Sequence, residues 1–176
     1  MKLVVCFNIV WGLYSTMGAV ISSFTGQFGF GPSDNTLFSI SFALVGMIGS
    51  FVTGRYLDKT KQFRKAHTRL SFLLAAMIPI CYLALLTRIN WFAAIFMAVL
   101  GFATVPFLPV SFEYGAELTF PLGQALMGGI LFGTSQIFAT ILLLIVQQLI
   151  EISVLLFFAF LFFLMTVNFL VSLSIQ

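Results

Sequence analysis

Six long apolar runs follow one another along the chain, and short polar stretches separate them. Each run approaches the ~20 residues that an α-helix needs to cross a bilayer, and no polar segment of domain size lies between them. The pattern therefore predicts an all-α membrane protein in which residues 1–176 form a single bundle of six transmembrane helices. The expected spans are residues 3–24, 35–57, 70–87, 91–111, 125–147 and 151–172.

The first apolar run also has the form of a secretory signal peptide, because Met1 and Lys2 precede it. Its apolar character, however, continues to about Phe24, which is long enough to cross ~30 Å of hydrocarbon at ~1.5 Å per residue. We therefore favour a first membrane span over a cleaved leader.

Polar and small residues share one face of this first span, because they recur every three or four positions: Asn8, Gly12, Ser15, Ala19 and Ser22. An adjoining face carries Trp11 and Tyr14. Close helix packing around a hydrogen-bonded Asn8 is one interpretation of the pattern. The other is one wall of a substrate cavity, in which the two aromatic rings stack on a cation.

The fifth expected span is the most polar, and its small and polar residues again share one face: Gly129, Gly133, Gln136, Thr140 and Gln147. Gln136 lies about eleven residues into the span, roughly 16 Å deep and close to the bilayer centre. Lipid offers an amide no partner, so Gln136 must face protein or water. An interhelical hydrogen bond remains an alternative, but the glycines on the same face favour a ligand contact.

Glycine and proline indicate how the spans pack. Spans one, two, four and five contain glycine, whereas spans three and six contain none. Glycine-bearing membrane helices pack closely, so we expect spans three and six to lie outermost, as in a three-plus-three inverted repeat. Span two carries a small-residue ridge at Ala43, Gly46, Ser50 and Gly54, and Pro106 and Pro109 should bend span four.

Composition excludes several classes of protein. Hydrophobic residues make up 61% of the chain and charged residues only 7%, whereas a soluble domain has about a quarter of its residues charged. No soluble domain remains that could bind nucleic acid. Cys6 and Cys81 lie singly in apolar runs and His67 is the only histidine, so we expect no metal site and no cofactor.

Basic residues cluster between the second and third spans, where six of the eight Lys and Arg residues lie: Arg55, Lys59, Lys61, Arg64, Lys65 and Arg69. If this connection is cytoplasmic, Lys2 joins it on that side and only Arg88 lies on the other. The positive-inside rule then places both termini in the cytoplasm.

The basic cluster begins with Gly54-Arg55-Tyr56-Leu57-Asp58-Lys59 and continues to Arg64 and Lys65. It resembles the cytoplasmic signature of the major facilitator superfamily, Gly-x-x-x-Asp-Arg/Lys followed by basic residues, although Lys61 stands where that signature has a second glycine. Gly54 would let helices approach, and Asp58 could pair with a basic helix end. The resemblance implies one six-helix half of a facilitator fold, built as a 3+3 inverted repeat.

A narrower resemblance lies in residues 109–121, which contain Phe-Glu at 112–113 and Glu-Leu-Thr-Phe-Pro at 117–121. This run is similar to the end of the tenth helix in the feline leukaemia virus subgroup C receptor family of haem- and choline-type carriers. Residues 128–131 and 135–138 are similar to that family's eleventh helix. The resemblance extends over nearly the whole chain as helices seven to twelve, the C-terminal half of such a carrier.

The family resemblance implies transport of a small organic solute, such as choline, ethanolamine or haem, by alternating access. Gln136 matches a glutamine that contributes to the family's binding cavity, and Tyr14 corresponds to a seventh-helix aromatic residue. Together with the two polar faces, this predicts a substrate site made by Gln136, Tyr14, Trp11, Asn8 and Thr140.

Glu113 and Glu117 are four residues apart and share a helix face at the expected cytoplasmic boundary. A catalytic pair is not expected, because no nucleophile or metal site accompanies them. We expect them instead to contact the basic cluster as gating residues. The predicted cytoplasmic motif is then Gly54, Asp58, Lys59, Arg64, Glu113 and Glu117.

A facilitator carrier holds its solute between two six-helix halves, and this chain supplies six spans. The expected partners are therefore a small solute, the lipid bilayer and a second half. Three interpretations remain open: part of a longer carrier, a half that pairs with itself or a partner, and a remnant of such a carrier. The rival function is a non-transporting scaffold or regulatory protein, and an enzyme is not expected.

Overall fold

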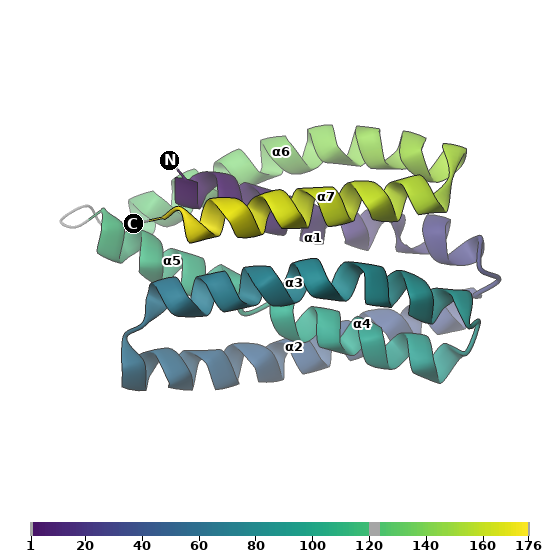
Figure 1. Cartoon of the computed structure of the whole chain (residues 1–176), viewed down its shortest axis with the longest axis horizontal. Helices are drawn as coiled ribbons and strands as arrows, with labels where there is room; N and C mark the ends of the chain where they lie inside the picture. The colour runs from purple at the N-terminus through teal and green to yellow at the C-terminus, as the bar shows by residue number, and fades with distance from the viewer. Residues whose placement is uncertain (1, 120–123, 176) are drawn as a thin grey trace.

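The computed structural model describes residues 2–119 and 124–175, and these form seven α-helices (Figure 1). Helices α4 and α5 together make one apolar span, so six spans are long and apolar enough to cross a membrane. The predicted all-α membrane fold is confirmed. The helices are α1 (Lys2–Gly26), α2 (Pro32–Thr60), α3 (Phe63–Leu86), α4 (Asn90–Thr104), α5 (Phe107–Leu118), α6 (Gln124–Ile152) and α7 (Val154–Leu173).

The connections are shorter than hydropathy indicates. Between α2 and α3 only Lys61 and Gln62 are non-helical, and Lys61 caps α2 in the left-handed conformation, with φ 53°. The expected loop at residues 58–69 is therefore wrong in extent, and so is the break at 148–150, because α6 runs to Ile152. Lys, Arg and Gln form helix readily, so the helices continue past the apolar runs that define the spans.

Pro32 and Asp34 define the start of α2. The helix begins at Pro32, whose missing N–H suits the first helical position. One Asp34 carboxylate oxygen accepts a hydrogen bond from the Gly31 N–H at 2.8 Å, and the other accepts one from the Asn90 amide at 2.6 Å. Asp34 thus ties the beginning of α2 to the beginning of α4.

The fourth span is broken, as its prolines predict. Helix α4 ends at Thr104 and α5 begins at Phe107, with Pro106 between them. Proline removes a backbone donor and clashes with the preceding turn, so the helix changes direction there.

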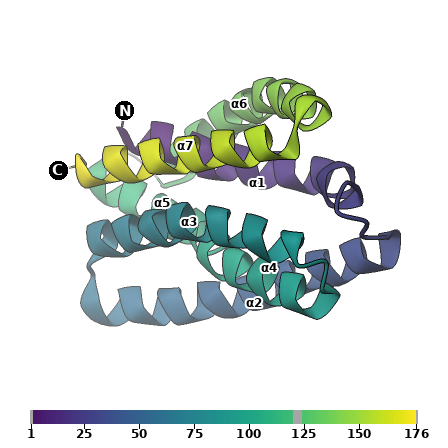
Figure 2. The same ribbon diagram turned by 45° about the vertical axis from the view of Figure 1, so that its right-hand side comes forward.

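The helices pair in a pattern that repeats. Helix α1 packs mainly on α6, α2 on α4, and α3 on α7. Figures 1 and 2 show α1, α6 and α7 above α2, α3 and α4, so the contact between α3 and α7 joins the two groups. In terms of spans, the pairs are one with five, two with four, and three with six. Exchanging span one for four, two for five and three for six leaves this set of pairs unchanged. Because three is odd, the second triplet starts from the opposite side of the membrane, which is the relation found in a 3+3 inverted repeat.

Helices α2 and α4 approach closely through glycine. A Cβ at Gly49 would lie 2.6 Å from the Phe102 carbonyl oxygen, and one at Gly46 or Gly101 would overlap Val105 or the Phe42 backbone. The small-residue ridge of span two is therefore a packing face at Gly46. The same ridge is open at Gly54, where a Cβ would meet nothing within 4 Å.

The expectation that spans three and six lie outermost is wrong for this bundle. In their apolar windows α3 and α7 are 44% and 33% buried, whereas α2 and α6 are only 17% and 28% buried. On α2 the glycine contact with α4 covers one face and leaves the rest open, whereas on α6 the open side includes Gly129 and Gly133, where a Cβ would meet nothing within 4 Å. The glycine-free α3 and α7 instead pack on each other through larger side chains.

Candidate functional site

Helices α1 and α6 lie side by side and run in the same direction (Figure 1). The Thr134 hydroxyl donates to Asn8 Oδ1 at 2.9 Å, and about two turns further along α1 the Thr16 hydroxyl donates to the Ala139 carbonyl at 3.3 Å. Between them Gly12 faces the Phe138 ring. Asn8 therefore takes part in helix packing, and its amide oxygen is satisfied.

Gln136 lies on α6 between these two contact points, so it is level with Trp11 and Tyr14 along the bundle. Its side chain is exposed, and so is the rest of the fifth-span stripe, from Gly129 to Gln147. The Thr140 hydroxyl donates to the Gln136 carbonyl of its own helix at 2.9 Å. The six-helix bundle leaves this polar stripe open, so its side chains face outward from the chain.

An aromatic cluster adjoins the stripe. The ring centroids of Trp11 and Tyr14 are 4.6 Å apart, Tyr14 stacks on Phe42 at 5.8 Å, and Phe132 meets Trp11 edge-on at 5.6 Å. Sequence reasoning missed Phe42 and Phe132. Phe132 was accessible to it, because it stands one turn before Gln136, whereas Phe42 joins the cluster only through the docking of α2.

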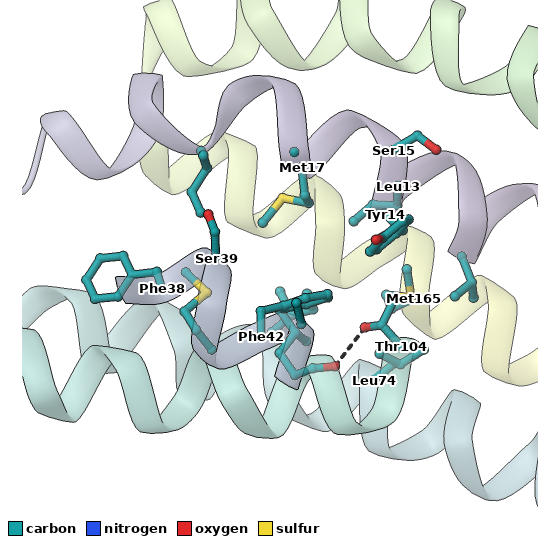
Figure 3. A pocket seen from close by; sticks show the side chains of 17 residues that line it. Leu13, Tyr14, Ser15, Met17, Phe38, Ser39, Phe42, Leu74, Thr104 and Met165 are labelled. Atoms are coloured by element: carbon teal, nitrogen blue, oxygen red, sulfur yellow. Dashed lines mark hydrogen bonds between the residues drawn. The ribbon is translucent and has the colours of Figure 1, made fainter. Parts of the chain in front are cut away.

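A cavity of about 270 Å³ lies beside Tyr14, between α1, α2, α3, α4 and α7 (Figure 3). Tyr14 and Phe42 are on its wall, and most other lining side chains are apolar. The Thr104 hydroxyl on the wall donates to the Leu100 carbonyl at 2.7 Å. Of the predicted substrate residues only Tyr14 lines this cavity; Trp11 touches Tyr14 from outside it, and Gln136, Asn8 and Thr140 lie on or near the open face.

The predicted cytoplasmic motif lies at the end of the bundle where α1 begins and α7 ends (Figure 1). Asp58, Lys59, Glu113 and Glu117 are exposed there, and Arg64 donates to the Leu173 carbonyl at 3.2 Å. The direct contact between the acids and the basic helix ends stays a prediction. Phe120 and Pro121 of the family-like run lie outside the described residues.

A second polar region, which sequence reasoning missed, is enclosed between α3, α5 and α7. The His67 Nδ1 and Ser172 Oγ atoms are 2.8 Å apart, and the His67 ring lies 4.5 Å from the Phe107 ring, centroid to centroid. Asn168 lies one turn from Ser172 on α7, and Ser111 lies one turn from Phe107 on α5. Both Asn168 and Ser111 are 0% exposed. We call His67, Ser111, Asn168 and Ser172 the buried polar node.

Within the described part of the chain, four side-chain atoms of the buried polar node have no hydrogen-bond partner: His67 Nε2, Ser111 Oγ and both amide atoms of Asn168. Sequence reasoning left Asn168 out of the candidate site. Its spacing of four from Ser172 was the available signal. No group of three or more His, Cys, Asp or Glu residues in the described ranges is placed to hold a metal ion.

The six spans, their repeated pairing and the open polar stripe define the class of this protein, a multi-pass membrane protein with the architecture of one facilitator half. No family model matches the chain. It is 28% identical to the choline/ethanolamine transporter flvcr2a of Danio rerio over 64% of this chain and 24% of the relative. It is 25% identical to solute carrier family 49 member A3 of Xenopus tropicalis over 84% of this chain.

A further relative, the choline/ethanolamine transporter FLVCR1 of Mus terricolor, is 25% identical over 77% of this chain. These relatives confirm the resemblance to the feline leukaemia virus subgroup C receptor type of carrier. The chain spans only part of their length, 24% of flvcr2a and 31% of the Xenopus protein.

Proposed function

We propose that the chain is the C-terminal six-helix half of a facilitator-type carrier that moves a small organic cation across a membrane by alternating access. The observation that carries this proposal is the open face of α1 and α6. There the Trp11–Tyr14 pair, with centroids 4.6 Å apart, lies level with the exposed Gln136. Support comes from relatives whose names describe choline/ethanolamine transporters.

The chemistry of this face suits an ammonium ion. A cation over a Trp or Tyr ring gains about 0.5–1 kcal/mol at an exposed site and about 2 kcal/mol when water is excluded. The Gln136 amide oxygen can accept a hydrogen bond from an ammonium or hydroxyl group. Neither α1 nor α6 carries an acid except Glu151, near the far end of α6, so attraction by the aromatic faces replaces a fixed counter-ion.

The names of the relatives favour choline or ethanolamine over haem. The cavity beside Tyr14 has a volume of about 270 Å³, which is just below the ~300–1,000 Å³ range of ligand pockets. The wall around Tyr14 and Phe42 is mostly apolar, and the one histidine, His67, is buried in a different part of the bundle. Of the proposed site, this cavity borders Tyr14 alone.

A second six-helix half completes the site in this proposal. The least buried helices, α2 and α6, expose large apolar side chains that a second half would cover, including Met47 at 65% and Ile137 at 67% exposure. Rocking of the two halves about the membrane centre would then open the face around Gln136 to one side at a time. Lys2 and the basic helix ends lie at one end of the bundle, so the positive-inside rule places that end in the cytoplasm.

Uptake of labelled choline and ethanolamine tests the proposal, in cells that express this chain together with a first six-helix half. Gln136→Leu should abolish uptake while membrane insertion stays intact. Gln148→Leu is the matched control, because Gln148 is also exposed on α6 but on another face. Unchanged uptake in Gln136→Leu removes this residue from the site. An assembly that inserts and never moves solute supports the rival scaffold function instead.

A further inference from the structure

A basic cleft lies on the outer surface of α3, at the end of the bundle that carries the N-terminus of α1. Its volume is about 380 Å³, and its lining residues are Arg64, Lys65, Thr68, Arg69 and Leu173. The four α3 residues stand at positions i, i+1, i+4 and i+5, so they form one face of the helix. Three of the five lining side chains are cations and none is an acid.

Neutral oxygens hold the two arginines of the cleft in place. Arg64 donates to the Leu173 carbonyl at 3.2 Å, and Arg69 donates to the Tyr56 hydroxyl at 3.2 Å. Thr68 shares a hydrogen bond with Ser172 at 3.2 Å, which fixes the floor of the cleft to α7. The charges are therefore positioned by their contacts but not neutralised by them. An anion placed in the cleft would meet preoriented guanidinium donors.

An aromatic surface continues the cleft toward the membrane interior. Phe72 lies three residues beyond Arg69 on α3, which is about 4.5 Å further along the helix axis. It is 58% exposed, and its ring centroid is 5.4 Å from that of Phe169 on α7. The outer surface of α3 and α7 thus changes from basic to aromatic within one helical turn.

We propose that this basic cleft binds the headgroup of an anionic phospholipid, with an acyl chain lying over Phe72 and Phe169. A phosphate ester supplies a negatively charged partner for Arg64, Lys65 and Arg69. Guanidinium groups bind phosphate oxygens two at a time. A soluble anion would account for the cations but would make no use of the exposed aromatic surface beside them. Anionic lipids are concentrated in the cytoplasmic leaflet, which is the leaflet that the positive-inside rule assigns to this end. The site does not depend on transport by the chain.

Lipid binding to the purified 176-residue chain in neutral detergent tests the proposal, with phosphatidylserine as the probe and phosphatidylcholine as its comparison. The variant Arg64→Gln/Lys65→Gln/Arg69→Gln should weaken phosphatidylserine binding of the order of a hundredfold, at about fivefold for each cation. The matched control is Arg55→Gln/Lys59→Gln/Lys61→Gln, which removes three cations from the end of α2 and its cap. It should change the affinity by no more than about fivefold.

Equal losses in the two triple variants would show general attraction to a basic surface and would overturn the proposal. So would inorganic phosphate competing with phosphatidylserine at equal concentration, because the cleft would then be a site for a free anion. Lys65→Gln guards against misfolding of the triple variant, since it removes one cleft charge alone. It should weaken phosphatidylserine binding about fivefold relative to Lys61→Gln, and equal affinities would refute the site.

Discussion

The open face of α1 and α6 and the buried polar node of α3, α5 and α7 place polar side chains in opposite surroundings. Gln136 on the open face is exposed, whereas Asn168 in the node is 0% exposed. Both are amides on apolar helices, and their sequence contexts differ little. On the open face the hydrogen bonds of Asn8 and Thr140 are local or between neighbouring helices, while both Asn168 amide atoms in the node lack a partner within the described ranges.

This difference separates two uses of polarity in a membrane helix. A solute can reach a polar group on the open face, which contributes little to the folding of the chain. A polar group in the node affects stability directly, because an unsatisfied buried donor or acceptor costs about 1–3 kcal/mol. The His67–Ser172 contact offsets part of that cost, and water inside the node would offset more.

Replacing an amide by a carboxylate in each region gives the largest expected contrast. Asn168→Asp should destabilise the protein by about 3–5 kcal/mol, because it buries a charge that has no partner. Gln136→Glu should destabilise the protein less, because its side chain lies on the open face, where water or a second half can solvate the charge. Thermal unfolding of both purified variants at neutral pH measures the difference. Similar losses in the two variants would mean that the regions do not differ in burial.

Removing one aromatic ring tests the open face as a cation site. Trp11→Ala should weaken the apparent affinity for choline about 5- to 30-fold, which corresponds to the loss of ~1–2 kcal/mol of cation–π attraction. Trp91→Ala is the matched control, because Trp91 is 74% exposed at the start of α4. The concentration dependence of choline uptake in the paired assembly provides the measurement. Equal effects of the two substitutions would count against the Trp11–Tyr14 site.

Two serine substitutions distinguish a dry node from a hydrated one. Ser172→Ala removes the partner of His67 and should destabilise the protein by about 1 kcal/mol. Ser111→Ala removes an oxygen that has no partner in the described structure, and in a dry node it should leave stability unchanged or raise it slightly. Chemical unfolding in mixed micelles measures both. A loss of about 1 kcal/mol in Ser111→Ala as well would indicate that bound water joins these groups.

Thr140→Val should have the smallest effect. Its hydroxyl bonds to the carbonyl of its own helix, so stability should change by less than about 0.5 kcal/mol. If the hydroxyl also contacts the solute, the apparent affinity for choline should fall a few fold. Uptake and unfolding measured on the same variant separate the two roles. A loss of stability without a loss of affinity would assign Thr140 to packing.

Much of the fold was predictable from local features of the chain. Hydropathy located the six spans, Pro106 located the break between α4 and α5, and Gly46 marked the close contact with α4. These features act through the backbone and through the cost of polar groups in lipid, so a short window of sequence contains them. The extent of the basic helix ends was missed, because a charged residue ends an apolar run without ending a helix.

The sites were predictable only in part. The contact between Trp11 and Tyr14 was predictable because the two share a helix face, whereas Phe42, which stacks on Tyr14, comes from another helix. Asn8 and Gln136 looked alike as polar residues at helical spacing, yet one is hydrogen-bonded to Thr134 and the other is exposed. Spacing identifies which residues share a face, and it does not say what covers that face.

By itself the sequence determined the class of fold, the number of spans and the two polar faces, since each follows from composition and helical periodicity. Only the tertiary structure decided which helices are buried, that α2 and α6 stay open, and that His67 meets Ser172 across 105 residues of chain. Burial depends on side chains that are remote in sequence and are brought together by helix packing. That packing left Gln136 exposed and enclosed Asn168, although both are amides in apolar helices.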